Sequence, residues 1–113
     1  MRVRVTVEAD PMTAGARASL RVYAVAELHR TLHGHTAWID AVEVVCRRDR
    51  GTTPRWRVEV EVSLWDGARF DAHATAPRPH AAVDEVAHAA WAGVRHRVRI
   101  GAATTPTPAA ASS

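Results

Sequence analysis

Apolar and polar residues alternate in four segments of this chain, and that period of two is typical of strands that bury one face. The first segment is 2–8, and the second lies within 38–48. The third, 55–65, is the most regular, and Asp66-Gly67 after it is a strong signal for a short hairpin. The inward-facing residues are predicted to be Val3, Val5 and Val7, then Val42, Val44 and Cys46, then Trp56, Val58, Val60, Val62 and Leu64, and finally Phe70, Ala72, Ala74 and Ala76.

Two other segments repeat apolar residues at spacings of three and four, which predicts amphipathic helices. The first helix is expected over 14–32, with Thr13 as its N-cap and Gly34 as its stop signal. The second is expected to begin near Pro79 or His80, because proline is tolerated in the first helical turn.

The resulting element order is β-α-β-β-β-α. A right-handed crossover should make the first two strands parallel, and the later strands should form an antiparallel meander. Because each strand has only one apolar face, both helices must cover the same side of the sheet. The predicted fold class is α+β, a four-stranded mixed sheet with two helices packed on one face. The opposite face is expected to be exposed, with Arg2, Arg4, Arg57, Glu59, Glu61, Arg69 and His73.

The 113 residues suffice for one hydrophobic core but not for two. We assign 1–100 to a single domain and predict that 101–113, an Ala/Thr/Pro/Ser tail without large apolar residues, is disordered. Cys46 is the only cysteine, which excludes an intrachain disulfide and favours the reducing cytoplasm. We expect no signal peptide and no membrane span, because no segment has the required apolar run.

The formal net charge is +3, and all 15 basic side chains other than histidine are arginine. This mildly basic balance permits RNA or another polyanion as a partner. The alternative for each arginine is an ordinary solvated side chain, and the cluster at 95–99 is the one least easily explained in that way. The candidate RNA-binding residues are Arg17, Arg21 and Arg30 on the first helix, Arg95, Arg97 and Arg99 near the end of the second, and Arg47, Arg48 and Arg50 in a polar loop after the second strand.

The hairpin and the start of the second helix resemble the ribosome hibernation promoting factor family, also known as ribosome-associated inhibitor or sigma-54 modulation proteins. The matching strings are Arg55-Trp56-Arg57-Val58-Glu59-Val60, Gly67, His80-Ala81-Ala82-Val83-Asp84 and, on the first helix, Leu20-Arg21-Val22-Tyr23. The resemblance covers about residues 1–100. The chain departs from the family pattern at Glu27, Arg78, His80, Ala89 and Ala90, and we expect no counterpart of the dimerising domain of the long members.

The resemblance implies a short or divergent, non-enzymatic and cytoplasmic protein that binds the small ribosomal subunit and its rRNA. It would inhibit translation under stress or in stationary phase, by occupying the channel used by mRNA and tRNA. No cofactor is implied. The main alternative is a protein-interaction module of the same fold, with a possible homodimer through the exposed sheet face.

Other site chemistries receive less support from the sequence. His29, His33 and His35 could share a helix end, but no cysteine pair or carboxylate at ligand spacing completes a metal site. Cys46 falls on an apolar strand face, and no recognisable nucleophile motif occurs, so we predict no catalytic residues. Trp65 is expected at the hairpin end, either as a partly covered rim residue or as an exposed ring that stacks on a base or joins an interface.

Overall fold

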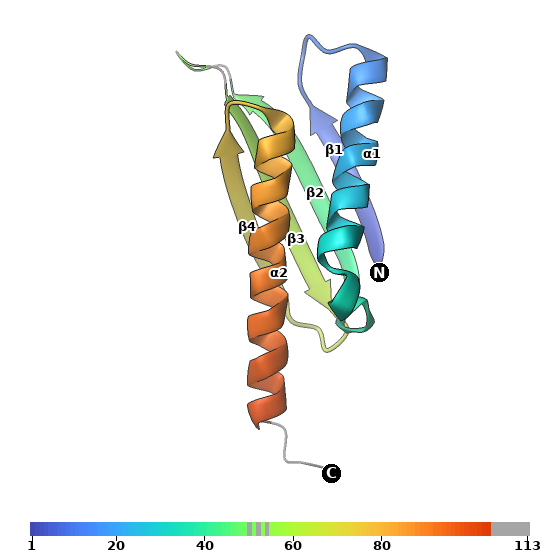
Figure 1. Cartoon of the computed structure of the whole chain (residues 1–113), viewed down its shortest axis with the longest axis vertical. Helices are drawn as coiled ribbons and strands as arrows, with labels where there is room; N and C mark the ends of the chain where they lie inside the picture. The colour runs from blue at the N-terminus through green and yellow to red at the C-terminus, as the bar shows by residue number, and fades with distance from the viewer. Residues whose placement is uncertain (50, 52, 54, 105–113) are drawn as a thin grey trace.

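The computed structural model describes residues 1–49, 51, 53 and 55–104, with side chains as far as Arg99. Figure 1 shows the predicted order of strands and helices, with one short 3-10 helix added between the first long helix and the second strand. The elements are β1 (Arg2–Glu8), α1 (Ala14–Thr31), η1 (His33–Trp38), β2 (Ile39–Asp49), β3 (Arg55–Leu64), β4 (Arg69–Ala76) and α2 (Pro79–Thr104).

The four strands form one mixed sheet in the order β1-β2-β3-β4. β1 pairs with β2 in parallel, and the two remaining pairs are antiparallel, as predicted. The register places Val5 opposite Val44, Val44 opposite Val60, and Val60 opposite Ala72. Apolar residues therefore align in rows across all four strands, which gives the sheet one continuous apolar face.

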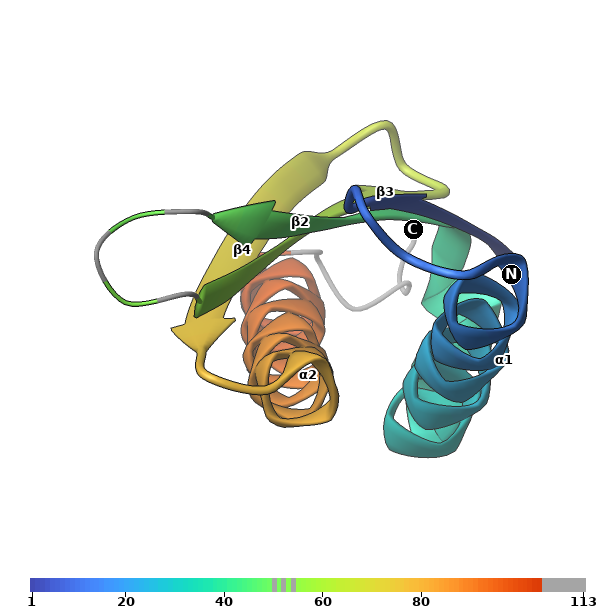
Figure 2. The same ribbon diagram turned by 90° about the horizontal axis from the view of Figure 1, so that it is seen from above.

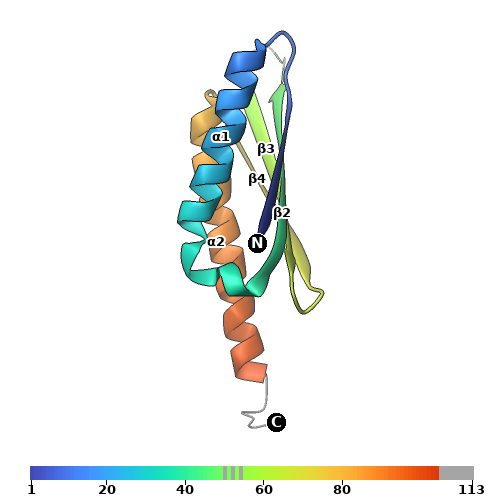
Figure 3. The ribbon, with the colours of Figure 1, turned by 90° about the vertical axis from the view of Figure 1, so that its right-hand side faces the viewer.

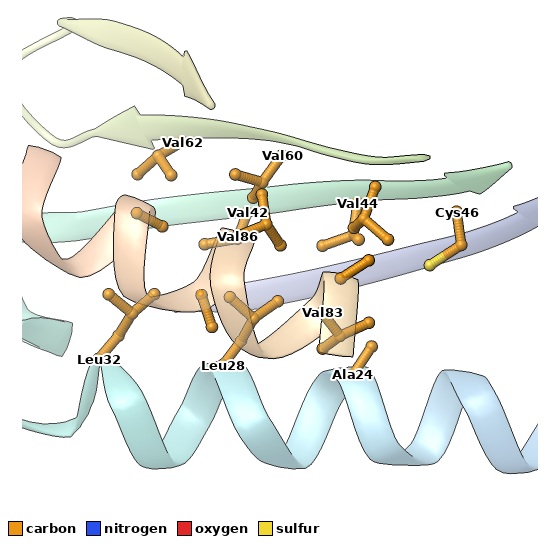
Figure 4. Packing of buried hydrophobic residues seen from close by; sticks show 14 of the residues in the cluster. Ala24, Leu28, Leu32, Val42, Val44, Cys46, Val60, Val62, Val83 and Val86 are labelled. Atoms are coloured by element: carbon orange, nitrogen blue, oxygen red, sulfur yellow. The ribbon is translucent and has the colours of Figure 1, made fainter. Parts of the chain in front are cut away.

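Both long helices lie on that one face, and the opposite face carries none of the described helices (Figures 2 and 3). Figure 1 also shows that α1 and α2 begin at the same end of the molecule and run in the same direction. The core lies between the helices and the sheet (Figure 4), where Leu28, Val42 and Val86 have no exposed surface. No described polar or charged residue is buried, so the side-chain contacts of the interior are apolar.

Small residues on α2 bring this helix close to the sheet. Ala82, Ala87 and Ala90 are fully buried. A side chain at Gly93 would overlap the ring of Phe70 on β4, so this glycine is required by close approach rather than by backbone conformation. The other special glycine is Gly67, whose φ of 90° completes the turn between β3 and β4.

Thr13 caps α1 as predicted, with its hydroxyl accepting a 3.1 Å hydrogen bond from the amide of Ala16. α1 ends at Thr31, before the predicted stop at Gly34, because η1 takes over the chain at His33.

The predicted loop after the second strand is partly wrong. Arg47, Arg48 and Asp49 belong to β2, because this strand continues to pair with the ends of β1 and β3. Arg50 lies outside the described residues.

At the C-terminal end of the domain, α2 continues to Thr104, four residues beyond the predicted limit of the domain. The predicted disorder of the rest of the tail concerns 105–113, which lie outside the described residues. Neither α1 nor any other described helix is long and apolar enough to cross a membrane.

Candidate nucleic-acid interface

The predicted RNA-binding arginines do not gather on one surface. They lie in three places: along α1, at the C-terminal end of β2, and on the C-terminal half of α2. The three sets of arginines differ in how many hydrogen bonds and ion pairs their guanidinium groups already make within the chain.

Arg17 is engaged inside the fold. Its guanidinium donates to the backbone carbonyls of Val7 at 3.3 Å and Ala9 at 3.1 Å, and it lies 3.4 Å from the Asp10 carboxylate. Only 28% of the Arg17 side chain is exposed. This arginine therefore ties the start of α1 to the end of β1, and its hydrogen-bonding capacity is largely used there.

The two other candidates on α1 differ from each other. Arg21 is exposed, and no ion pair joins it to another described residue. Arg30 makes a two-point contact with Glu27, with nitrogen–oxygen distances of 3.0 and 2.6 Å. Glu27 is one of the positions that depart from the family pattern, and its carboxylate neutralises the neighbouring arginine.

The β2 arginines lie on opposite faces of the sheet. Arg47 is on the open face, 2.9 Å from Glu8 and 3.8 Å from Glu59. Arg48 is on the helix side, where it donates to the carbonyl of Pro11 at 3.1 Å and lies 5.0 Å from the centre of the Trp56 ring. Both arginines thus have partners within the chain, and both contribute to holding the sheet end together.

The open face also carries Arg57, which donates to Glu59 at 2.7 Å. This hydrogen bond is the main cause of a lowered pKa of the Glu59 carboxyl. Next to it, Glu43, Glu61 and Asp71 stand opposite one another on three adjacent strands. The middle of the open face is therefore acidic, which disfavours a phosphate backbone there.

The C-terminal half of α2 has a different character. The last acidic residue of the sequence is Glu85, and Arg95, Arg97 and Arg99 follow it, all exposed. Val94 is still fully buried against the core, and only the last turns of α2 extend beyond the sheet and α1 (Figure 1). Arg95 lies 5.1 Å from the ring centre of Trp91 and Arg97 lies 6.0 Å from that of Phe70, but no described carboxylate pairs with either. These arginines keep their charge available to an external anion.

A groove runs between α1 and α2, and sequence reasoning did not find it. It is lined by Glu27, Arg30, Thr31, Asp84, His88 and Trp91. Nearby, the Tyr23 hydroxyl donates to Asp84 at 2.6 Å, and the His80 ring meets the Tyr23 ring edge-on at 4.4 Å. The hydrogen bond to Asp84, followed by desolvation, raises the pKa of Tyr23 to about 12. The only available signal was that Tyr23 and Asp84 both occur in the strings that resemble the family.

The four tryptophans fall into two classes. Trp56 is 6% exposed and belongs to the core, as predicted, and Trp91 is half-buried, stacked on His88 with ring centres 5.5 Å apart. By contrast, Trp38 is 53% and Trp65 68% exposed. The amide of Trp65 donates to the carbonyl of Trp38 at 3.1 Å, so the two backbones lie side by side at one end of the molecule.

The structure offers little to the other chemistries. Cys46 is fully buried, and desolvation raises the pKa of its thiol to about 11, so it is a core residue as predicted rather than a nucleophile. Among the described residues, no three or more His, Cys, Asp or Glu side chains are grouped so that they could hold a metal ion.

The sequence matches no protein-family model and no curated protein significantly. The structure, however, is similar to solved structures. One is a ribosomal subunit interface protein from Coxiella burnetii, with a TM-score of 0.68, 16% identity, and coverage of 88% of this chain and 99% of the other. Another is the N-terminal domain of Protein Y from Thermus thermophilus, with a TM-score of 0.65, 17% identity, and coverage of 86% and 99%. The chain therefore has the fold of these two proteins, and the fold that the family resemblance implied is confirmed.

Proposed function

We propose that this chain belongs to the hibernation promoting factor family and binds the small ribosomal subunit through its rRNA. It restrains translation by occupying the channel used by mRNA and tRNA, with no chemistry of its own, and it acts in the cytoplasm, where ribosomes are. The observation that carries the proposal is the shared fold with a ribosomal subunit interface protein over nearly the whole length of that protein.

The charge distribution supports the same proposal and narrows its site. An exposed helix segment with three arginines and no acidic residue suits contacts to phosphates, which give affinity without reading sequence. We therefore place the main rRNA contact on Arg95, Arg97 and Arg99, with Arg21 as the remaining free candidate on α1. Arg17, Arg30, Arg47 and Arg48 contribute less, because each is already bound within the chain.

Co-sedimentation with purified small subunits tests the proposal. The R95A/R97A/R99A variant should bind far more weakly than the wild-type chain, and its dependence on salt should be shallower by about two to three in log–log slope. The matched control is R4A/R47A/R57A, which removes the same charge from the open sheet face and should bind almost as well as wild type. Equal losses in both variants would indicate a net-charge effect and contradict the assignment of the site.

A cell-free translation assay then tests the consequence of binding. The wild-type chain should inhibit peptide synthesis at concentrations comparable to that of the ribosomes, and the α2 variant should not. A wild-type chain that stays in the soluble fractions at low salt would contradict ribosome binding itself.

The second candidate is a protein-interaction module that dimerises through the open sheet face. The observation in its favour is that Arg17 and Arg30 on α1 are consumed by contacts within the chain, which leaves the helix side less basic than the family pattern implies. Light scattering across a concentration series separates the two candidates, since a monomer that binds small subunits supports the first and a dimer without ribosome binding supports the second.

A further inference from the structure

Trp38 and Trp65 are the feature of this surface that rRNA phosphate binding does not explain. Large aromatic rings are rarely left exposed without a reason, because each would gain from burial. The indole of Trp91 already has His88 and Arg95 as partners, and Trp56 has Arg48. Within the described part of the chain, neither Trp38 nor Trp65 has an aromatic or cationic partner of this kind.

The two exposed rings are carried by well-anchored backbone. Trp38 ends η1, and the buried residue that follows it, Ile39, pairs with Leu64, the buried residue that precedes Trp65. The backbone hydrogen bond between Trp65 and Trp38 joins the two segments directly. Two side chains that are 27 residues apart in sequence are thus presented from one rigid corner of the sheet.

The charges around this corner favour an anionic partner. η1 contacts α2, and the acid-free half of that helix lies at the same end of the molecule as η1 and the β3–β4 turn (Figures 1 and 3). Of the two nearest acids in sequence, Asp40 is paired with Arg2 at 3.5 Å, whereas Asp66 accepts from the neutral amide of Ala68 at 2.9 Å and keeps its charge. A phosphate chain is therefore attracted toward α2.

The acidic residues on the open sheet face limit the route that a bound RNA strand can take. The row formed by Glu43, Glu61 and Asp71 repels phosphates from the middle of the sheet. A strand that meets the tryptophans is expected to continue over the end of the molecule to α2 rather than across the sheet.

We infer that Trp38 and Trp65 stack on unpaired bases of an RNA strand whose phosphates are held by Arg95, Arg97 and Arg99. This deepens the proposed function and rests on it, because it specifies that the RNA bound at this end is single-stranded. Exposed aromatic rings stack on any base, while a base-paired helix keeps its bases out of reach of such rings. A protein partner would also cover the two indoles, but it would not require the adjacent acid-free helix.

Fluorescence anisotropy with labelled RNA tests the inference. The probes are a single-stranded RNA of about 10 nucleotides, a sugar–phosphate chain of the same length without bases, and a fully paired RNA duplex. The variants are W38A/W65A, W38F/W65F, R95A/R97A/R99A and, as a matched control, V22A, which removes another exposed apolar side chain (69% exposed) from α1.

Loss of stacking weakens binding by about 5- to 140-fold per base. We expect W38A/W65A to lose at least as much affinity for the single-stranded RNA as the loss of one stacked base would cause. This variant should bind the single-stranded RNA and the base-free sugar–phosphate probe equally well. Affinity for the paired duplex should change less than twofold, W38F/W65F should recover part of the loss, and V22A should match wild type. Circular dichroism melting confirms that each variant is folded.

Three other outcomes overturn the inference in distinguishable ways. If R95A/R97A/R99A weakens binding but W38A/W65A does not, the stacking site is wrong while the proposed function stands. If the tryptophan variant changes only the oligomeric state, the corner is a protein interface. If the wild-type chain binds neither these RNAs nor small subunits, the proposed function fails as well.

Discussion

The Tyr23 hydroxyl donates a 2.6 Å hydrogen bond to the Asp84 carboxylate, and this contact joins the middle of α1 to the first turns of α2. The two residues are 61 positions apart in the sequence; Tyr23 is half-buried at the edge of the core, and Asp84 is exposed. The parallel arrangement of the two helices brings them together. The hydrogen bond therefore reports directly on how the helices are docked on the sheet.

We predict that this contact makes stability sensitive to alkaline pH. The pKa of Tyr23 is raised to about 12 in the folded state, from an ordinary value of 10.0. The folded state therefore holds the phenolic proton more tightly than the unfolded state, so the contribution is complete below pH 10 and is lost as the pH rises to about 12. Urea denaturation of wild type and Tyr23→Phe across this range should show a difference in unfolding free energy that shrinks as the pH rises.

The comparison with Tyr23→Phe is needed because Cys46 changes in an overlapping range. Burial raises the pKa of the Cys46 thiol to about 11, so the stability of the folded protein also falls as this thiol ionises at rising pH. This loss is the same in wild type and in Tyr23→Phe. At pH 7 we expect Tyr23→Phe to cost about 1 kcal/mol, the usual net contribution of one hydrogen bond. A difference that stays constant up to pH 12 would show that the hydrogen bond does not form in solution.

Arg17→Ala should lower stability without weakening ribosome binding. The guanidinium of Arg17 satisfies the carbonyls of Val7 and Ala9, and its removal leaves these groups without that partner. We expect a loss of about 1–2 kcal/mol in urea denaturation. Binding of the folded fraction to small subunits should remain within twofold of wild type. A large loss of binding at unchanged stability would instead indicate that Arg17 contacts rRNA directly.

Gly93→Ala should destabilise the protein, although alanine is the better helix former. A Cβ at this position overlaps the Phe70 ring, and forcing the ring aside costs about 1–3 kcal/mol, against a gain of up to about 1 kcal/mol in helix propensity. Gly15→Ala is the matched control, since nothing lies within 4 Å of its Cβ, and it should be neutral or stabilising. Thermal melting should therefore shift in opposite directions, and combining Gly93→Ala with Phe70→Leu should recover part of the loss.

Two glutamates that are two positions apart on β3 should respond to substitution with opposite signs. Glu61 stands between Glu43 and Asp71, so Glu61→Thr removes repulsion and should stabilise the protein by about 0.5 kcal/mol. Glu59 accepts a hydrogen bond from Arg57, and Glu59→Thr should destabilise it slightly. Urea denaturation at low and high salt checks both, because added salt should diminish each difference.

The hydrogen bond between Arg57 and Glu59 also predicts how the stability of the protein changes in acid. The pKa of Glu59 is lowered in the folded state, so its contribution to stability is present above the ordinary value of 4.5 and is lost as the pH falls through the lower folded value. Wild type and Glu59→Thr should therefore converge in stability at strongly acidic pH. A difference that persists there would assign the effect of Glu59 to packing instead of to its charge.

Local pattern was sufficient to predict the strands, the helices and the side of the sheet that they cover. Alternation along 55–64 places Val58, Val60 and Val62 on one face, and hydrophobic burial leaves such a strand no other orientation. The same holds for Trp56 and Cys46, whose burial follows from their register in the strand. The end of β2 was mispredicted because Arg47 and Arg48 read as a polar loop, whereas pairing with two neighbouring strands extends the sheet through them.

The sequence alone therefore determined which residues form the sheet, the two long helices and the apolar core, because those depend on periodicity over neighbouring residues. Only the tertiary structure decided which arginines remain free. Arg17 and Arg99 are both arginines on predicted helices, and nothing in their local sequence separates them. In the structure, Arg17 donates to backbone carbonyls, whereas Arg99 is exposed near the end of α2, which extends beyond the sheet. It also brought Trp38 beside Trp65, because side-chain partners far apart in the chain are set by strand register and helix docking, which no local pattern contains.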